Sequence, residues 1–267
     1  MTGLAMTVTT ARSLAMDLTR LGVRPGMSLL VHSSLKSLGW VEGGAQAVLD
    51  ALLEATGPGG TVLVPTHTGH LTDPEFWTNP AVPRELWEPM RAQLPPFEPG
   101  RTASWGMGAI PEALRLREGS LRSGHPLHSF AALGPRARAL LEPHALDRGL
   151  GETSPLARLE AVDARVLLLG VDHSVNTSLH LAEYRARWPG WAVLQSRAPL
   201  LVDGVKRWVD FEELNHRSED FQALGAAWRA AQGGRGLGQV GEASAELVPL
   251  RPLLVFSVPW LSDRKFS

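Results

Sequence analysis

Two short apolar segments on either side of one amphipathic helix constrain the fold of this 267-residue chain most strongly. Residues 28–31 and 61–65 are predicted strands, and the second is too apolar to be half exposed. Residues 45–55 between them have apolar side chains at helical spacing, and Gly57-Pro58-Gly59-Gly60 ends that helix. A strand, a helix and a strand in so short a span indicate a right-handed parallel crossover. Ligands of such sheets gather at the carboxyl ends of the strands.

The remaining periodicity extends this pattern along the chain. A helix over residues 10–21 stops at Gly22, and Ser154 followed by Pro155 is typical of a helix start. The clearest hairpin spans residues 200–209 and turns at Asp203-Gly204. We further predict helices over 106–117, 135–142 and 221–231, strands over 129–133 and 165–171, a loop over 233–238, and an apolar segment of undecided type over 253–261. The predicted fold is α/β: a single domain of residues 1–267 with a mostly parallel central sheet flanked by helices.

Residues 69–104 interrupt the pattern. Prolines accumulate there beside Trp77 and Trp87. Disordered segments are poor in aromatic residues, so this composition favours an ordered excursion over a flexible linker. We expect residues 69–104 to form a lid or a pocket wall.

Composition excludes several classes of function. The net charge is -1 and the arginines are scattered, so the chain has no electrostatic footprint for nucleic acid or an anionic membrane. The absence of cysteine excludes a structural disulfide, a cysteine-ligated zinc and a protein thioester. No apolar run is long enough to span a bilayer, and residues 1–6 lack the blocks of a signal peptide. We therefore expect a cytoplasmic protein.

The segment from Thr177 to Glu183 carries the strongest chemical signal. On a helix, His180 and Glu183 share one face, so an imidazole and a carboxylate converge at the carboxyl edge of the sheet. That pair suits proton removal from an incoming nucleophile. Asp172, at the end of the preceding strand, is the next carboxylate within reach. The alternative interpretation is a half-buried histidine with an unrelated surface glutamate.

The common nucleotide-binding loops are missing. The chain has no Walker sequence, and Gly106-Met107-Gly108 lacks the third glycine of a dinucleotide fingerprint because Pro111 stands there. The segment that starts at Gln232 is similar to the Gln-x-x-Gly-x-Gly loop of the common N-acetyltransferase superfamily, but Arg235 stands where that loop requires a glycine. The fold of that superfamily is therefore not expected.

Histidines could also be combined into a metal site. His125 and His128 lie three residues apart, and His173 occurs later in the chain. Pro126 separates the first two, and their spacing is not that of a helix or tight hairpin that would hold a metal. We expect no metal, and we expect His128 to be a hydrogen-bonded core residue.

Four segments occur together in a fixed order. They are His32-Ser33-Ser34-Leu35-Lys36-Ser37-Leu38-Gly39, Thr56-Gly57-Pro58-Gly59-Gly60-Thr61, Arg122-Ser123-x-His125-Pro126-x-x-Ser129 and Ser154-Pro155-Leu156-x-Arg158-Leu159. In and after the excursion, Asp73-Pro74, Trp77, Asn79-Pro80 and Gly106-Met107-Gly108 match the same pattern. From about residue 10 to residue 261, the chain resembles the aminoglycoside 3-N-acetyltransferase family.

The resemblance implies transfer of an acetyl group from acetyl-CoA, as co-substrate, to an amine of an aminocyclitol. It places His180 and Glu183 at the reacting centre. It also implies that two segments line the CoA channel, with these binding residues: His32, Ser33, Ser34, Leu35, Ser37, Leu38, Gly39, Arg122, Ser123 and His125. Hydroxyls and backbone amides there can grip the amides and phosphates of the cofactor, and Gly39 permits close backbone approach.

The chemistry requires a base, because an amine that attacks a thioester must first be neutral. His180 is the candidate base, and Glu183 would orient it, stabilise its charged form or hold the cationic amine. The Thr177 hydroxyl or a backbone amide could receive the oxyanion. Direct transfer is simpler than a covalent relay, although an acyl group on Ser33 or Ser34 stays open.

An aminoglycoside is a polycation, so its pocket should display carboxylates. Both the excursion and the region after residue 209 supply them, and most carboxylates lie on solvated faces. The predicted substrate-binding residues are Asp73, Trp77, Glu98 and Asp210.

Three alternatives remain open from the residues alone. The acceptor could be an amine of another metabolite. The protein could be a metal-dependent hydrolase that uses His125, His128 and His173, or a CoA-binding protein without catalysis. Partners are otherwise limited to small molecules, with a homodimer as a possibility.

Overall fold

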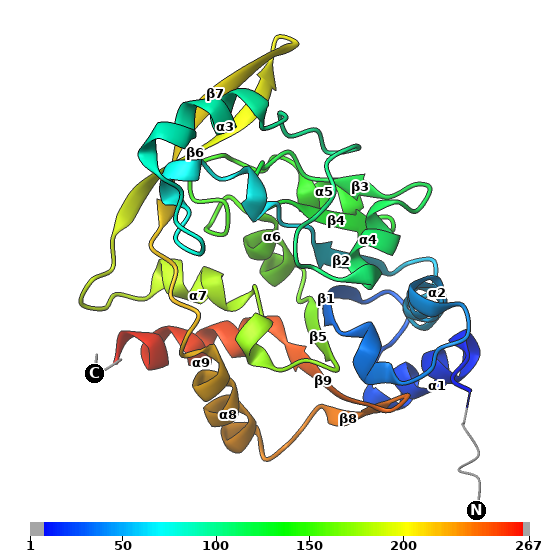
Figure 1. Cartoon of the computed structure of the whole chain (residues 1–267). Helices are drawn as coiled ribbons and strands as arrows, with labels where there is room; N and C mark the ends of the chain where they lie inside the picture. Colours follow the sequence, from blue (N-terminus) through cyan, green and yellow to red (C-terminus); the bar gives the residue numbers. More distant parts are fainter. Residues whose placement is uncertain (1–7, 264–267) are drawn as a thin grey trace, which may run out of the picture.

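A mixed seven-stranded sheet forms the centre of the protein in a computed structural model that describes residues 8–263 (Figure 1). The strand order is β3-β4-β2-β1-β5-β9-β8. The strands are β1 (Ser28–Ser33), β2 (Thr61–Pro65), β3 (Leu121–Arg122), β4 (Phe130–Leu133), β5 (Arg165–Leu169), β8 (Leu237–Val240) and β9 (Ala243–Pro249). The three central strands β2, β1 and β5 are parallel, and the outer strands on both sides pair antiparallel. The parallel pairing of β1 and β2 across a helix confirms the predicted crossover.

Helices cover both faces of this sheet. The helices are α1 (Ala11–Leu21), α2 (Gly44–Thr56), α3 (Trp87–Gln93), α4 (Ala109–Arg115), α5 (Ala137–Leu141), α6 (Pro155–Ala161), α7 (Leu179–Arg185), α8 (Phe221–Gln232) and α9 (Leu250–Ser262), and all of them except α3 contribute to the cores on the sheet. Alternate residues of each parallel strand enter two separate cores, as Leu29 and Leu30 do in β1. The first core includes α1, α2 and α4, and the second includes α5 to α9. This is the α/β architecture of parallel strands buried on both faces.

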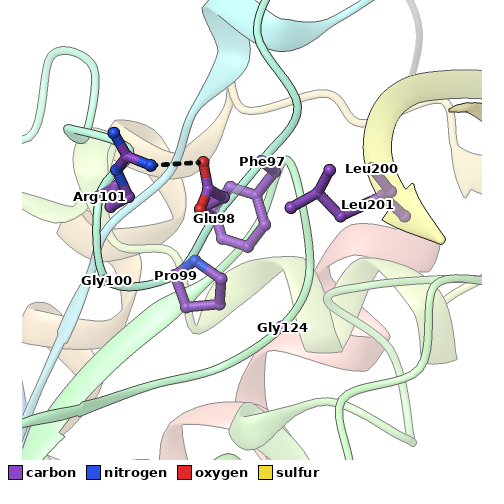
Figure 2. A pocket seen from close by; sticks show the side chains of 8 residues that line it. All are labelled: Phe97, Glu98, Pro99, Gly100, Arg101, Gly124, Leu200 and Leu201. Carbon is purple, nitrogen blue, oxygen red and sulfur yellow. Dashed lines mark ion pairs between the residues drawn. The ribbon is translucent and has the colours of Figure 1, made fainter. Parts of the chain in front are cut away.

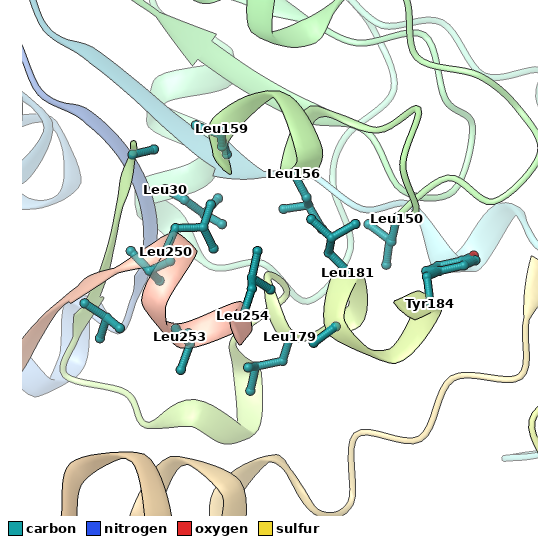
Figure 3. Packing of buried hydrophobic residues seen from close by; sticks show 14 of the residues in the cluster. Leu30, Leu150, Leu156, Leu159, Leu179, Leu181, Tyr184, Leu250, Leu253 and Leu254 are labelled. Carbon is teal, nitrogen blue, oxygen red and sulfur yellow. The ribbon is translucent and has the colours of Figure 1, made fainter. Parts of the chain in front are cut away.

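Leucines dominate the second core (Figure 3). Leu30 of β1, Leu156 of α6, Leu181 of α7 and Leu254 of α9 are each at most 1% exposed. The apolar segment left undecided in the sequence is therefore the helix α9. Burial of these side chains fixes α7, which carries the predicted catalytic pair, against the sheet.

Backbone conformation explains where several elements differ from their predicted ends. The helix predicted from residue 106 starts only at Ala109, because Gly106 and Gly108 have φ values of 71° and 91°. The strand predicted over residues 165–171 ends at Leu169, before Gly170 at φ 70°. Leu237 begins strand β8 where a loop was expected. Strands β3, β8 and β9 were not predicted.

The excursion and a hairpin form a separate unit beside the sheet. The excursion contains α3 and three 3₁₀ turns, η2 (Gly69–Leu71), η3 (Pro74–Phe76) and η4 (Arg84–Leu86). The hairpin strands β6 (Val193–Val202) and β7 (Val205–Leu214) are longer than predicted and turn at the expected residues. A small third core joins the excursion to the hairpin. It is built from Leu71, Phe97, Leu127, Ala198 and Phe211. The excursion is therefore ordered, as its composition indicated.

The ends of the chain limit two of the expectations. Residues 1–7 and 264–267 lie outside the described residues, so the signal-peptide expectation and the outer bounds of the single domain stay predictions. Across residues 8–263, no helix is long and apolar enough to cross a bilayer.

Two neighbouring residues of α9 provide a test of the packing. Leu254 is 1% exposed and Val255 is 69% exposed. We expect Leu254→Ala to lower the free energy of unfolding by about 2–5 kcal/mol, because it removes methyl groups and leaves a cavity. Val255→Ala should change it by less than about 0.5 kcal/mol. Urea unfolding of both variants measures the difference, and equal losses would contradict this placement of α9.

Candidate active site

A cleft of about 460 Å³ opens at the carboxyl ends of β1, β2 and β5. It is lined by residues 31–36, Pro65, residues 106–109, Pro111, Val171, Val175 and Thr177. The strand ends bring these segments together although they lie far apart in the sequence. The position agrees with the edge at which ligands of parallel sheets bind.

The segment after β1 supplies polar groups to this cleft. Burial, together with the nearby His173 and His180, lowers the pKa of His32 to about 3, so its imidazole is neutral. The hydroxyl of Ser37 donates to Ser34 Oγ at 2.9 Å and to the carbonyl of Gly170 at 3.0 Å. These bonds tie the segment to the loop that follows β5.

His180 and Glu183 form a hydrogen-bonded pair on α7. The distance between His180 Nδ1 and Glu183 Oε2 is 2.7 Å. The carboxylate only accepts, so Nδ1 carries the proton and Nε2 keeps its lone pair. The other oxygen of Glu183 accepts the backbone N–H of Arg217 at 3.1 Å. Both carboxylate oxygens are thus used to hold the imidazole in one orientation.

The pair lies beside the cleft. The backbone N–H of His180 donates to the carbonyl of Thr177, whose residue lines the cleft. His180 is also close enough to His32 and His67, at the ends of β1 and β2, to contribute to their lowered pKa values. Its side chain is 17% exposed and is surrounded by His216, Phe221 and Glu183.

Three further residues extend the pair into a larger cluster. His216 lies between two carboxylates, with Nδ1 3.6 Å from Glu183 and Nε2 3.7 Å from Glu213. Glu213 in turn faces His128 at 3.6 Å and accepts the Tyr184 hydroxyl at 2.7 Å. We call His128, His180, Glu183, Glu213 and His216 the histidine–carboxylate network.

The charges of the network shift its pKa values in opposite directions. Burial and the neighbouring His216 lower the pKa of His180. Burial alone would raise the pKa of Glu183 and lower that of His216. The contacts of Glu183 with His180 and His216 outweigh its burial, so the pKa of Glu183 falls to about 2. The contacts of His216 with Glu183 and Glu213 likewise outweigh its burial, so the pKa of His216 rises. The arrangement can therefore hold a neutral base beside a buried negative charge.

Asp172 is not joined to this network. Its carboxylate accepts the N–H and hydroxyl of Ser174 and a proton of Gln222. These bonds cap the short turn η5 (His173–Val175) and lower the pKa of Asp172. The structure thus assigns Asp172 to the shape of the loop and does not bring it into contact with His180.

Several residues expected at the cofactor have other contacts. Leu35 lines the cleft, but Leu38 is fully buried in the core. Gly39, at φ 77°, has the side chain of Glu242 where a Cβ would be, so its close approach is to the protein. The cofactor roles expected for Leu38 and Gly39 therefore stay predictions.

The second predicted cofactor segment supports the scaffold. Arg122 donates to the carbonyls of Thr66, Pro99 and Thr102, which joins the excursion to the sheet. The Ser123 hydroxyl accepts the N–H of Phe130, and His125 Nδ1 accepts those of residues 127 and 128. Ser123 and His125 are fully buried and hydrogen-bonded within the protein, and their predicted cofactor contact stays a prediction.

The predicted substrate residues lie in the excursion and the hairpin. Asp73 is fully buried and receives two 2.8 Å hydrogen bonds from Arg91, which excludes direct substrate contact in this conformation. The indole of Trp77 donates to the Thr72 carbonyl, and exposed Asp210 pairs with Arg197 at 3.1 Å.

Glu98 lines a second hollow between the excursion and the hairpin (Figure 2). This hollow has a volume of about 460 Å³, and Glu98 pairs there with Arg101 at 3.6 Å. Phe97 and Leu200 provide its apolar wall. Of the three acidic residues predicted to contact the substrate, Glu98 and Asp210 are accessible and Asp73 is buried.

The three histidines of the metal-hydrolase alternative are not brought together. His173 lies 3.4 Å from Glu246, next to Gly225, whereas His125 and His128 face Glu213. Within the described part of the chain, the groups with metal-like spacing are His128, Glu213 and His216, and His180, Glu183 and His216. Both belong to the histidine–carboxylate network.

Sequence reasoning missed the role of His216 and gave Glu213 no particular place. One signal was present: Glu213 and His216 repeat in reverse the three-residue spacing of His180 and Glu183. Glu213 lies near the end of strand β7 and His216 follows that end, so spacing alone did not indicate that the two pairs meet.

The network predicts distinct titrations for two histidines. We expect His216 to titrate above 6.5, because two carboxylates face it, and His180 to titrate below 6.5. NMR of the ring nitrogens as a function of pH measures both. Glu213→Gln removes one carboxylate and should lower the pKa of His216. A wild-type value below 6.5, or no change in the variant, would contradict the proposed charges.

Comparison with known proteins agrees with this geometry. The family model described as aminoglycoside 3-N-acetyltransferase matches residues 30–262. The chain is 40% identical over 252 residues to the SPbeta prophage-derived aminoglycoside N(3')-acetyltransferase-like protein YokD of Bacillus subtilis, covering 94% of this chain and 92% of that protein. It is 36% identical to aminoglycoside N(3)-acetyltransferase VII of Streptomyces paromomycinus, covering 96% and 92%.

Solved structures give the same result. The crystal structure of YokD from Bacillus subtilis matches with a TM-score of 0.92 and 39% identity, over 97% of this chain and 95% of that chain. The binary complex of AAC-IIIb with CoASH matches with a TM-score of 0.86 and 33% identity, over 97% and 98%. The chain therefore belongs to the aminoglycoside 3-N-acetyltransferase family.

Proposed function

We propose that this protein transfers the acetyl group of acetyl-CoA to the 3-amino group of an aminoglycoside, with His180 as general base. The observation that carries the proposal is the 2.7 Å bond between His180 Nδ1 and Glu183 at the edge of the cleft. It leaves Nε2 as the acceptor for a proton of the incoming amine.

The cleft suits a pantetheine arm, which alternates amides with alkyl segments. Ser34 and Thr177 supply hydroxyls, and Val31 and Val175 supply apolar surface. One relative of this family was crystallised with CoASH. Acetyl-CoA would contribute the thioester, and the residues of the cleft would orient it toward α7.

The reaction needs one base and one place for developing charge. His180 Nε2 removes a proton from the ammonium or from the attacking amine. The nitrogen then bonds to the thioester carbon, the carbon–sulfur bond breaks, and the proton is available for the departing thiolate. Glu183 stabilises the imidazolium formed on the way, and the Thr177 hydroxyl is the nearest proposed donor to the oxyanion.

Direct transfer is favoured over an acyl-serine. The hydroxyl of Ser33 is buried, and that of Ser34 accepts a bond from Ser37. Neither has a base at hydrogen-bond distance among the described residues. His180, by contrast, has a carboxylate partner at 2.7 Å and is bonded through its backbone to Thr177, which lines the cleft.

The acceptor is assigned from charge. Glu183 and Glu213 give the centre two carboxylates, and Glu98 and Asp210 lie on the excursion and hairpin. Ammonium groups are bound most strongly by charge-assisted hydrogen bonds. Relatives such as that of Streptomyces paromomycinus are named as aminoglycoside N(3)-acetyltransferases. The proposal includes a cytoplasmic location, while a homodimer stays an untested expectation.

Removal of the base should greatly lower turnover without weakening the binding of acetyl-CoA. We expect His180→Ala to lower kcat by about 10²–10⁴ while the Kd for acetyl-CoA stays within about threefold. Thiol release and calorimetry measure the two quantities. The control is His70→Ala, which alters a histidine outside the network and should retain activity within about threefold. Turnover of His180→Ala within about tenfold of wild type would assign the base elsewhere.

The substrate class is tested by thiol release with a panel of amines. We expect aminoglycosides with a free 3-amino group to react, and 3-N-acetylated ones to be inert. Reaction with other amines alone would favour a different metabolic acceptor, and CoA binding without release would indicate a binding protein. Activity that requires a stoichiometric metal after chelator treatment would favour the hydrolase alternative.

A further inference from the structure

The hairpin of β6 and β7 has one covered edge and one open edge. On the outer side of β6, the carbonyl of Pro199 accepts the N–H of Phe97, in the excursion, at 2.8 Å. The two strands form a sheet of their own, so within residues 8–263 no third strand lies beside β7. Figure 1 shows the turn of this hairpin projecting away from the central sheet. An open edge strand presents backbone donors and acceptors that can pair with another chain.

The register shows which backbone groups of β7 point outward. In an antiparallel pair, every second residue bonds to the partner strand, and the residues between direct their N–H and carbonyl groups away from it. The N–H groups of Glu212 and Leu214 point outward, because they donate to side chains outside the hairpin at 2.8 and 3.2 Å. Lys206, Trp208 and Asp210 continue this alternation toward the turn. Across the described residues, no segment outside the hairpin supplies a hydrogen bond to the backbone groups of these three.

This open stretch is complementary to itself. When two copies pair antiparallel about a twofold axis at Trp208, Lys206 of each copy lies opposite Asp210 of the other. All the outward backbone groups of both copies then find partners, and opposite charges face each other at both ends. An axis at Lys206 or at Asp210 would instead place two like charges opposite each other and leave part of the stretch unpaired. The sequence of the edge thus selects one register.

The side chains along this edge leave it accessible. Lysine on an edge strand usually opposes pairing, because its charged end must stay in water. The ammonium of Lys206 instead donates to the carbonyls of Arg91 and Ala92 in α3, at 2.8 Å each. Carbonyls are neutral, so a carboxylate is still favoured beside this charge. The side chain of Asp210 is 70% exposed, and the apolar side chain of Val205, beside the open stretch, is 54% exposed.

We propose that β7 is a docking surface for a second copy of this chain, which joins the two hairpins into one four-stranded antiparallel sheet with its twofold axis at Trp208. The contact is isologous, because the same strand serves both copies. The carboxylate of Asp210 faces Lys206 of the second copy, and Val205 is covered. This assignment stands whether or not the protein transfers acetyl groups.

A charge exchange tests the register. Sedimentation equilibrium of the full chain should show a monomer and a dimer in equilibrium. Asp210→Lys places two lysines opposite each other at both ends and should raise the dissociation constant of the dimer by at least about tenfold. Adding Lys206→Asp to that variant exchanges the two charges and should restore the constant to within about threefold of wild type.

The control for this exchange is Glu219→Lys, which makes the same change of charge outside β7 at a side chain that is 71% exposed. It should leave the dissociation constant within about twofold of wild type. A wild-type protein that stays monomeric up to about 1 mM would overturn the proposal. A dimer that responds equally to Asp210→Lys and Glu219→Lys would also overturn it.

A proline tests the backbone bonds. Trp208→Pro removes the outward N–H, which the hairpin itself does not use, and proline is tolerated on edge strands. Trp208→Ala loses the same indole but keeps the N–H. The proline variant should therefore have a dissociation constant about tenfold above that of the alanine variant, because each dimer loses two backbone hydrogen bonds. Equal constants in two variants that fold would contradict the pairing.

Amide hydrogen exchange provides a readout that needs no substitution. The N–H groups of Arg207 and Val209 point toward β6, so they should be protected at every protein concentration. Those of Lys206, Trp208 and Asp210 should exchange quickly in dilute protein and slow down by about tenfold or more as the dimer forms. Exchange of these three amides that does not change while the protein dimerises would place the interface elsewhere.

Discussion

The buried carboxylate of Glu183 imposes the constraint on which the site depends. An ionised carboxylate without partners in a protein interior costs several kcal/mol, so every oxygen must be satisfied. One oxygen binds His180 and the other binds the backbone of Arg217, while His216 faces it from the segment after β7. The need to pair one charge therefore orients the imidazole of His180 and joins α7 to the end of the hairpin.

The sheet supplies the rigid frame for this pairing. Parallel strands buried on both faces end at one edge, and the cleft lies at that edge. The leucines of α7 that enter the second core hold His180 beside the cleft, as Leu179 and Leu181 show. One face of this short helix thus packs its leucines into the core, and the other face carries His180 and Glu183.

Local signals in the sequence were sufficient for much of this frame. Thr10 caps α1, Ser154 and Pro155 open α6, and the strands on either side of α2 pair in parallel. The His180–Glu183 pair also followed from helical spacing. These features depend on residues close together in the chain, where spacing and capping determine the structure.

Long-range contacts could not be predicted in the same way. Strand β9 is recognised only by its pairing with β5, and Glu213 and His216 matter only because the hairpin ends beside α7. Ser123 and Asp73 have polar side chains suited to ligands, yet in the fold Ser123 binds the backbone of Phe130 and Asp73 binds Arg91. Polar residue type indicates a capacity to bind, and tertiary contacts decide what is bound.

The hairpin has a consequence for how specificity can diverge in such a fold. Its strand β7 carries Asp210, which is exposed and paired with Arg197, and Glu213 of the histidine–carboxylate network, only three residues apart on one extended segment. A shift of this strand that moves Asp210 also displaces the carboxylate that faces His216. Under the proposed function, divergence in acceptor preference and retention of the charge balance around His180 would be linked through a single backbone.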